Sequence, residues 1–216
     1  MGRPLLHQPD AILDAARDLV ATGGRKAATV GAIARASRAP SGSIYHRFGS
    51  QDRVLIEAWV RAVRRFQAGF LEAIGQRGVP AAEAAVAAAL WTPRFASENP
   101  ADAVLLIRYR SEDLARFPLT DLDAADDVAA LNDPVIDAIR RLAVRLYGRI
   151  GRRGYETLTL AVVDLPYGAV RRHLGRRHPG RGGVELPSEL PAQLEAAVRA
   201  ALAAGPRPRR RRPAGS

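Results

Sequence analysis

The sequence predicts an all-α fold, with a small helical head at the N-terminus and a larger helical domain behind it. Alanine is abundant, and aromatic residues make up only 6% of the 216 residues. This composition favours helices over strands. Residues 29–48 carry two short helical patterns separated by a turn, and a long helical pattern begins at residue 51. The composition and the helical patterns therefore both predict an all-α fold.

Composition also limits the chemistry and the location of the protein. The chain has no cysteine, which excludes disulfides, thiolate metal sites and a cysteine nucleophile. It contains no apolar stretch of about 18 residues, the length that a membrane-spanning helix needs. Residues 1–9 lack the apolar segment of a signal peptide. We therefore expect a cytoplasmic protein with no membrane partner.

The N-terminal head is predicted to contain three helices. The first covers residues 9–22, where apolar residues share one face and Gly23 and Gly24 end the helix. In the other two, apolar residues recur at one-face spacing: Val30, Ile33 and Ala34, then Ile44 and Phe48. Thr29 can cap the second helix, and Pro40 is suited to the first turn of the third. Two short helices with a brief break predict a helix-turn-helix.

The exposed face of the third helix carries hydroxyl, phenol and cationic side chains and no carboxylate. Its members are Ser41, Ser43, Tyr45, His46 and Arg47, and Arg38 precedes them in the turn. Such groups can donate hydrogen bonds to phosphate oxygens and base edges, whereas carboxylates would be repelled by a duplex. Gly42 leaves space where the N-terminus of this helix would approach DNA closely. We therefore expect this face to bind double-stranded DNA.

The rest of the chain is predicted to be helical up to a terminal tail. A long helix is expected over residues 51–75. Further helices are expected at 81–97, 100–117, 124–152 with a break at 132–134, 154–174 with a kink at Pro166, and 188–204. The tail at 206–216 is rich in arginine and proline and is expected to be disordered. The expected domains are residues 1–50, residues 51–205 and this tail.

The charge of the chain is concentrated at its two ends. The net charge is +11; residues 1–75 hold eleven basic and six acidic side chains, and the tail after Gly205 holds five arginines. An excess of basic side chains can simply keep a protein soluble. Because part of it coincides with the helix-turn-helix, electrostatic attraction to DNA is the interpretation we favour.

The segment 29–55 resembles the DNA-binding motif of the TetR family of bacterial transcriptional regulators. The matching residues are Thr29, Ile33, Ala34, Gly42, Ile44 in place of Leu, Tyr45, Phe48 and Leu55. The departures are Ser37 and Arg38 for the usual Ala-Gly, Pro40 for a capping Ser, Arg47 for His, and Gln51 for a phosphate-binding Lys. Arg47 keeps a hydrogen-bond donor, whereas Gln51 loses a charge. In the resulting hypothesis Ser41, Ser43 and His46 approach bases, while Thr29, Tyr45 and Arg47 hold phosphates.

The resemblance also implies a homodimer, a palindromic operator and an effector. In the family the last two long helices form a four-helix bundle with the partner, and here these are residues 155–174 and 188–204. The alternative is that their apolar faces complete the core of a monomer. We favour the dimer, because paired heads reading half-sites roughly 34 to 36 Å apart make enough contact for specific binding. The resemblance thus implies a transcriptional regulator, most simply a repressor that a small molecule releases from DNA.

The resemblance also implies a small-molecule cavity between the long helix and the middle helices. The sequence does not identify the effector. Large side chains that could line the cavity are Trp91, Phe95, Tyr109, Phe117, Tyr147 and Tyr167, with Arg108, Arg110 and Asp164 as polar anchors. Taken singly, each of these residues is more typical of an ordinary core or surface position than of a pocket, since pockets and cores use the same residue types.

Catalytic and metal-binding patterns are missing from the sequence. The four histidines, His7, His46, His173 and His178, have no spacing typical of metal ligands. No paired carboxylates or phosphate-cradling loop accompany them, so we expect no enzyme, no metal and no cofactor. The rival function is a sequence-tolerant, nucleoid-type DNA-binding dimer without a ligand, whose arginine tail would carry much of the affinity.

Overall fold

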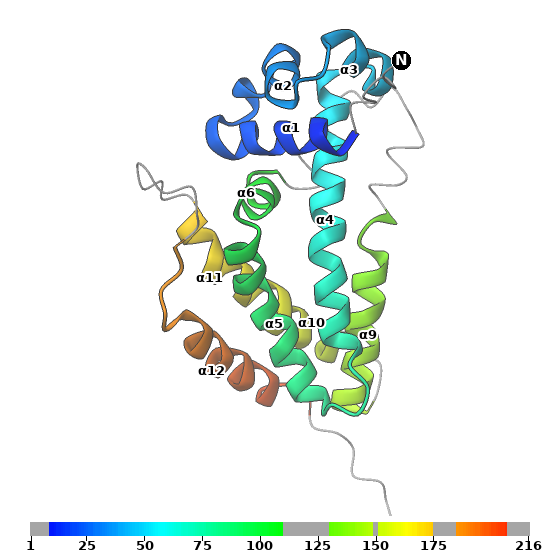
Figure 1. The fold of residues 1–216 in the computed structure, drawn as a ribbon. Coiled ribbons are helices and arrows are strands. Elements are labelled where there is room, and N and C mark those ends of the chain that lie inside the picture. The colour runs from blue at the N-terminus through cyan, green and yellow to red at the C-terminus, as the bar shows by residue number, and fades with distance from the viewer. Residues whose placement is uncertain (1–8, 110–129, 149–150, 175–184, 207–216) are drawn as a thin grey trace, which may run out of the picture. The chain divides into compact units, whose positions relative to one another are not determined.

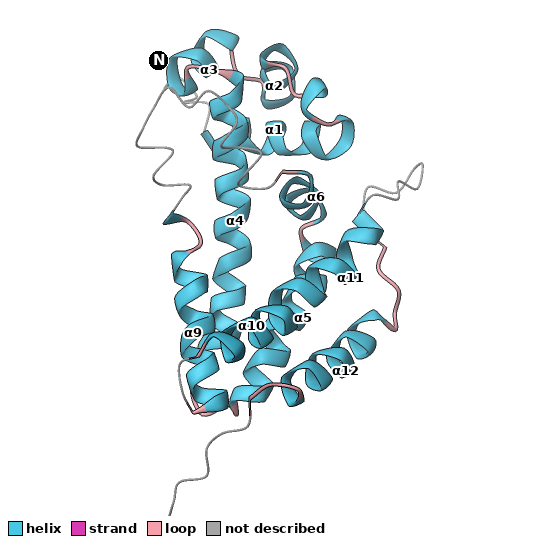
Figure 2. Cartoon of the chain, turned by 180° about the vertical axis from the view of Figure 1, so that it is seen from behind, coloured by secondary structure: helices cyan, strands magenta, loops and turns pink. Residues whose placement is uncertain are grey.

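The computed structural model describes residues 9–109, 130–148, 151–174 and 185–206, and within these ranges the chain is helical without strands. The all-α prediction is therefore confirmed. The head contains α1 (Pro9–Gly23), a short 3-10 turn η1 (Arg25–Ala27), α2 (Val30–Ser37) and α3 (Ser41–Phe48). The remaining elements are α4 (Gln51–Gly75), α5 (Ala81–Glu98), α6 (Pro100–Arg108), α9 (Asp133–Tyr147), α10 (Arg152–Thr159), the π-helical turn η2 (Leu160–Asp164), α11 (Leu165–Leu174) and α12 (Leu190–Ala203). Figure 1 follows these elements along the chain, and Figure 2 shows the same helices and loops from behind.

The chain divides into two compact units, and each unit combines two segments that are separate in the sequence. Unit 1 consists of Met1–Arg65 and Asn99–Leu131, and unit 2 of Phe66–Glu98 and Asn132–Ser216. Helix α4 thus begins in unit 1 and ends in unit 2. The expected division by function at residue 50 stays a prediction. Residues 1–8 and most of the tail, for which disorder was expected, lie outside the described residues.

The core of unit 1 is built by the three helices of the head and the first half of α4. Fully buried side chains come from each helix: Ile12 and Val20 from α1, Ile33 from α2, Ile44 from α3, and Val54 from α4. Burying a side chain of this size stabilises the fold by about 1.5 to 3 kcal/mol. The apolar spacing in the sequence predicted these contacts, and the structure confirms them. Leu105 of α6 joins the same core.

The helix ends of the head follow local hydrogen-bonding rules. The Thr29 hydroxyl accepts a hydrogen bond from the Ala32 amide at 3.2 Å, and the Ser50 hydroxyl accepts one from the Arg53 amide at 3.1 Å. Both residues therefore cap the helices that follow them, as predicted for Thr29. Pro40 is not in the first turn of α3 but directly before it, in an extended conformation. Its carbonyl accepts hydrogen bonds from the Ser43 and Ile44 amides.

Unit 2 is held together by close packing of α5 against its neighbours. A β-carbon at Gly69 of α4 would overlap the indole ring of Trp91, so glycine here lets α5 approach. The Trp91 ring nitrogen donates to the Phe66 carbonyl at 2.8 Å. In the first turn of α5, the Glu83 carboxylate accepts hydrogen bonds from both terminal nitrogens of Arg199 on α12 at 2.8 Å. The same helix α5 therefore contacts both α4 and α12.

Several predicted helix ends differ from the observed ones. Helix α6 ends at Arg108, because Tyr109 adopts an extended backbone, so the helix expected over 100–117 stops early. Helix α9 ends at Tyr147, where Gly148 takes a left-handed conformation, and does not reach residue 152. The segment expected over 154–174 contains the π-helical turn η2, which ends two residues before Pro166, and the kink at Pro166 stays a prediction. Proline has no amide hydrogen to donate, so a change in hydrogen-bond register is tolerated there.

A buried carboxylate joins three helices of unit 1. The Asp102 side chain of α6 is 3% exposed and lies 3.1 Å from Arg65 of α4 and 3.5 Å from Arg17 of α1. Asp10 and Asp14 of α1 bind Arg61 of α4 at 2.9 and 2.6 Å. Ion pairs therefore fix α1 against α4 and α6.

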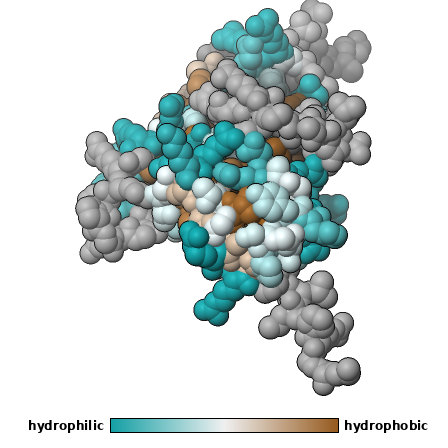
Figure 3. Space-filling model, turned by 90° about the horizontal axis from the view of Figure 1, so that it is seen from above, coloured by the Kyte–Doolittle hydropathy of each residue, from teal (hydrophilic) through white to brown (hydrophobic). Residues whose placement is uncertain are grey.

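Within the described residues, no helix is both long enough and apolar enough to cross a membrane. Exposed large hydrophobic side chains in these ranges are limited to Tyr45 and Leu160. On the face shown in Figure 3, hydrophilic residues border a smaller group of hydrophobic and intermediate ones.

Replacing Asp102 by alanine should destabilise the chain by about 2 kcal/mol, because the change leaves two arginines without their buried partner. Urea denaturation of the variant measures this as a lower unfolding midpoint. Asp137→Ala on α9 is the matched control, since its pair with Arg140 is exposed and should contribute less than about 1 kcal/mol. Equal losses of stability in the two variants would contradict the structural role of Asp102.

Candidate nucleic-acid interface

Helices α2 and α3 present one exposed polar surface, because their apolar residues are used inside unit 1. Val30, Ile33, Ala39, Ile44 and Phe48 are buried. The residues expected to bind DNA are all exposed: Thr29, Arg38, Ser41, Gly42, Ser43, Tyr45, His46 and Arg47. They extend from the cap of α2 to the last turn of α3. The fold therefore brings every one of them to the surface of one helix-turn-helix, while their contacts with DNA stay a prediction.

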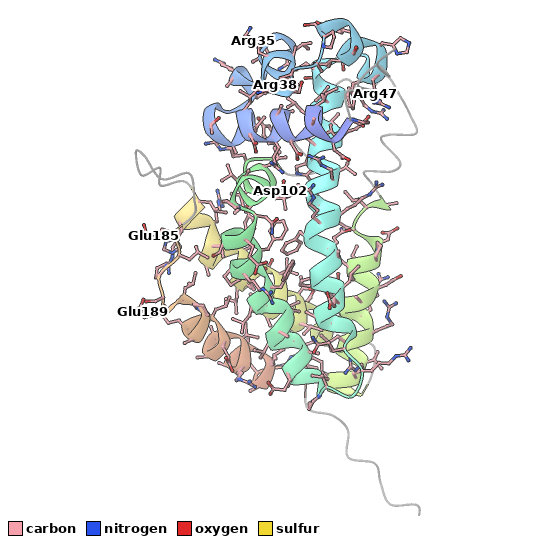
Figure 4. All side chains as sticks on the ribbon, in the orientation of Figure 1. Arg35, Arg38, Arg47, Asp102, Glu185 and Glu189 are labelled. Carbon is pink, nitrogen blue, oxygen red and sulfur yellow. The ribbon has the colours of Figure 1, made fainter. Side chains whose placement is uncertain are left out.

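The electrostatics of this surface favour an anion. No aspartate or glutamate occurs anywhere in residues 19–51. Arg35, Arg38 and Arg47 are exposed, and within the described residues none of the three forms a salt bridge (Figure 4). Other arginines of unit 1, such as Arg17, Arg25 and Arg61, bind carboxylates. The cations of the helix-turn-helix are thus left available for an external partner.

Arg35 is a cation of this surface that the sequence motif did not predict. It lies in the last turn of α2, on the side opposite the buried Ile33 and Val30. The motif points to α3 and the turn, and in α2 it predicts only the capping residue and the apolar face. The signal that identifies Arg35 is a cation on the polar side of a helix that contains no acid.

The start of α3 is open to a close approach from outside. A β-carbon at Gly42 would meet none of the described atoms within 4 Å, so the chain around it does not require glycine there. No described side chain caps this helix, which leaves its first amides directed outward. A phosphate could accept hydrogen bonds from such amides, as at other helix N-termini. Tyr45, 54% exposed despite its large ring, adds a phenol donor nearby on the same helix.

The residues expected to line a ligand cavity are divided between the two units. Trp91 and Phe95 lie together in unit 2, where the Phe95 ring meets the Phe66 ring edge-on at 5.3 Å and Phe66 stacks near Phe70 at 5.9 Å. Phe95 is 3% exposed, whereas Trp91 is only partly buried. The structure therefore supplies an aromatic cluster, which we define as Phe66, Phe70, Trp91 and Phe95.

Other expected cavity residues take part in packing elsewhere. In unit 2 the Tyr147 hydroxyl donates to the Leu202 carbonyl at 3.2 Å, and burial raises the pKa of this phenol. Tyr167 on α11 is half-buried. Arg108 and Tyr109 belong to unit 1, where the Tyr109 carbonyl accepts the Trp59 ring N–H at 2.9 Å. Phe117 and Arg110 lie outside the described residues, so a shared ligand site for this set stays a prediction.

One polar pair in unit 2 had no signal in the sequence. Gln67 of α4 is 7% exposed, and its amide nitrogen donates to the Asn132 side-chain oxygen at 3.2 Å. Asn132 directly precedes α9. Gln67 is the buried member of the pair, and a buried amide specifies geometry because an unmade hydrogen bond there costs free energy. The pair therefore fixes the start of α9 against α4.

Comparison with known proteins gives a family match for the head and fold matches for the whole chain. Residues 12–58 match the family model described as bacterial regulatory proteins, tetR family. A TetR-like transcriptional regulator from Rhodococcus sp. RHA1 has a TM-score of 0.66 and 18% identity, covering 94% of this chain and 100% of that chain. No curated protein matches the sequence.

Two further solved structures share the fold. FadR from Bacillus subtilis in complex with stearoyl-CoA has a TM-score of 0.63 and 14% identity, covering 91% of this chain and 98% of that chain. The ketosteroid regulator KstR2 of Mycobacterium tuberculosis has a TM-score of 0.62 and 15% identity, covering 92% of this chain and 95% of that chain. This chain therefore shares its helical fold with these proteins.

Arg47→Ala should weaken binding to duplex DNA roughly tenfold, because a charged hydrogen bond to phosphate contributes about 1.5 kcal/mol or more. It should also make the dependence of affinity on salt less steep, by about one unit of slope for each phosphate that is no longer neutralised. Fluorescence anisotropy across a salt series measures both. Arg153→Ala, which removes an exposed arginine of α10 in unit 2, should change neither. Unchanged affinity and slope in Arg47→Ala would exclude Arg47 from the interface.

Proposed function

We propose that this chain, which belongs to the TetR family of bacterial regulatory proteins, is a repressor that binds a palindromic operator as a homodimer and leaves it when a small molecule binds. The observation that carries the DNA-binding part is the exposed, acid-free surface of α2 and α3, which lies within the segment matching the family model. Exposed cations and hydroxyls are the groups that bind duplex DNA.

The residues of this surface divide by chemistry into two roles. Thr29, Tyr45 and Arg47 are assigned to phosphates, since a hydroxyl, a phenol and a guanidinium all donate to phosphate oxygens. Ser41, Ser43 and His46 are assigned to base edges in the major groove, where short donors and acceptors can read the sequence. Their position on α3 supports this division, because the second helix of a helix-turn-helix enters the groove.

The homodimer is proposed to form through residues 155–174 and 188–204. One face of each segment is already used inside unit 2: Val162, Val170, Leu194, Val198 and Leu202 are buried in the monomer. The opposite side of α12 exposes Ala196, Ala197, Ala200 and Ala203, and Leu160 of the π-helical turn is 46% exposed. Small residues allow helices to approach closely, and an exposed leucine gains from burial. One face of each segment thus packs within the monomer core, and a separate exposed face is proposed to contact the partner.

The effector is proposed to be a largely apolar molecule that binds in unit 2. The aromatic cluster supplies apolar surface there, with the polar Gln67–Asn132 pair on α4 and α9 of the same unit. Stearoyl-CoA binds to the structurally similar FadR of Bacillus subtilis, and long acyl thioesters are therefore the first compounds to test. Helix α4 contributes side chains to both cores. A ligand that changes the packing of unit 2 can therefore change the relative populations of the conformations of unit 1.

A second function, sequence-tolerant DNA binding, is favoured by one observation, the five arginines after Gly205. Such a tail would attract any duplex through its charge alone. In that case the tail, rather than α3, would account for most of the affinity, and its deletion would weaken binding to all sequences alike.

Titration with DNA from beside the gene and with random DNA of equal length separates the two functions. At near-physiological salt, we expect the operator to bind at least about a thousandfold more tightly. Addition of stearoyl-CoA to the operator complex then tests release, with the free fatty acid and coenzyme A as controls. Equal affinity for several upstream sequences and for random DNA would favour the sequence-tolerant function. A stable operator complex in the presence of every acyl thioester would reject that effector class.

Ala200→Glu should convert the dimer to a monomer, because it places a charge on the exposed face of α12 where the partner helix would pack. Sedimentation at micromolar concentration measures the change in mass, while an unaltered far-ultraviolet circular dichroism spectrum confirms the fold. Gln76→Glu adds the same charge at an exposed position between α4 and α5 and should leave the dimer intact. A dimeric Ala200→Glu variant with full operator affinity would contradict the proposed interface.

A further inference from the structure

The Thr159 hydroxyl is a buried polar group without a hydrogen-bond partner. Its oxygen is shielded from solvent, and within the described residues no other buried side-chain oxygen or nitrogen is left unpaired. Thr157 of α10, two residues earlier, shows the usual arrangement, because its hydroxyl donates to the Arg153 carbonyl at 2.8 Å. A buried hydroxyl without a partner costs free energy. Such a group indicates a partner that comes from outside the chain.

The backbone beside Thr159 leaves a second acceptor unpaired. Thr159 directly precedes the π-helical turn η2, in which the Leu165 amide donates to the Leu160 carbonyl. The next residue, Pro166, has no amide hydrogen. The Ala161 carbonyl would accept from Leu165 in an α-helix and from Pro166 in a π-helix, so it loses its donor in either register. Because Ala161 is fully buried, solvent does not replace this donor.

Helix α5, which packs against η2 in unit 2, carries a third unpaired acceptor. Pro93 lies inside this helix and supplies no hydrogen to the carbonyl four residues earlier, that of Ala89. Ala89 is also fully buried. Trp91 and Phe95 of the aromatic cluster flank Pro93 in the sequence of the same helix. Apolar surface and unpaired acceptors therefore lie on neighbouring elements of one unit.

These groups define the chemistry that unit 2 can bind. Carbonyl oxygens only accept hydrogen bonds, so a bound molecule has to donate one, whereas the Thr159 hydroxyl can donate or accept. The donor should carry no charge, because the described part of unit 2 has no buried carboxylate; the buried Asp102 belongs to unit 1. A carboxylate would have no hydrogen to donate to these acceptors. A neutral alcohol meets both requirements, since its hydroxyl donates and accepts without charge.

We propose that Thr159 binds the hydroxyl group of an apolar effector in unit 2. This inference rests on the proposed function, because it names the class of effector, and it narrows the apolar class given there to neutral alcohols. A thioester carbonyl can accept a hydrogen bond from Thr159 but has no hydrogen to donate to a carbonyl of η2 or α5. Thr159 is therefore the residue that sets the preference for a hydroxyl head group.

Compounds with the same alkyl chain separate the head group from the apolar part: 1-octanol, 1-methoxyoctane, octanoate and octylamine. Their binding to the full-length chain without DNA is measured by isothermal titration calorimetry at neutral pH. Thr159→Val removes the hydroxyl and keeps the shape of the side chain, whereas Thr159→Ser keeps the hydroxyl. Thr157→Val is the matched control, because it removes a hydroxyl that is already paired within its own helix. Thermal melting of each variant without ligand accompanies the titrations.

We expect 1-octanol to bind the unaltered chain roughly five- to tenfold more tightly than 1-methoxyoctane, the effect of one hydrogen bond. It should also bind more tightly than either charged compound. Thr159→Val should weaken 1-octanol binding roughly five- to tenfold, whereas Thr159→Ser and Thr157→Val should leave it unchanged. Thr159→Val should melt at the same temperature as the unaltered chain or above it, because the lost hydroxyl has no partner among the described residues.

Three results would overturn the inference. The first is 1-methoxyoctane or a charged compound binding as tightly as 1-octanol. The second is unchanged 1-octanol affinity in Thr159→Val, which would leave an internal water as the partner of this hydroxyl. The third is a lower melting temperature of Thr159→Val without ligand, which would show that the hydroxyl has a partner within the fold.

Binding without DNA and release of the operator are measured separately, so this inference and the proposed function fail in different ways. Binding of 1-octanol that depends on Thr159, with an operator complex that persists, would support the inference and reject release by the effector. Release of the operator by stearoyl-CoA, with no preference for 1-octanol, would support the proposed function and overturn the inference.

Discussion

The 25-residue helix α4 provides packing surface for both hydrophobic cores, and the rest of the structure depends on it. Val54, Leu55 and Trp59 of its first half complete the core beneath the helix-turn-helix. Phe70 and Ile74 of its second half belong to the core of unit 2. Neither core would be closed without this helix. Its apolar residues therefore pack against two sets of neighbours. In unit 2 a β-carbon at Gly69 would overlap the Trp91 ring, so glycine is needed where that ring crosses α4.

The polar surface of the head follows from the same packing. Once Ile33, Ile44 and Phe48 are turned toward α1 and α4, the hydroxyl and cationic side chains of α2 and α3 have to face solvent. Ion pairs use other arginines of unit 1, including the two that hold the buried Asp102. Several arginines of unit 1 are thus paired within the chain, whereas Arg35, Arg38 and Arg47 on the helix-turn-helix form no salt bridge with any described acid.

Local signals in the sequence were sufficient for the head and for α4. Apolar periodicity, the Thr29 and Ser50 caps and the glycines that end helices are all properties of neighbouring residues, and α4 was predicted at its observed bounds. Asp102 was not predicted as a buried residue, because its partners Arg17 and Arg65 lie far from it in sequence. The candidate DNA surface could be read from residue types, whereas a ligand site requires side chains from distant helices to meet.

Hydrogen–deuterium exchange of the full chain, with and without operator DNA, tests the central claim most directly. The account predicts slower exchange on binding for amides in residues 29–50, which contain α2, the turn and α3. Amides at the start of α3 should be among those affected, because they would donate to phosphate. Protection confined to other parts of the chain, with residues 29–50 exchanging as in the free protein, would contradict the assignment of this surface to DNA.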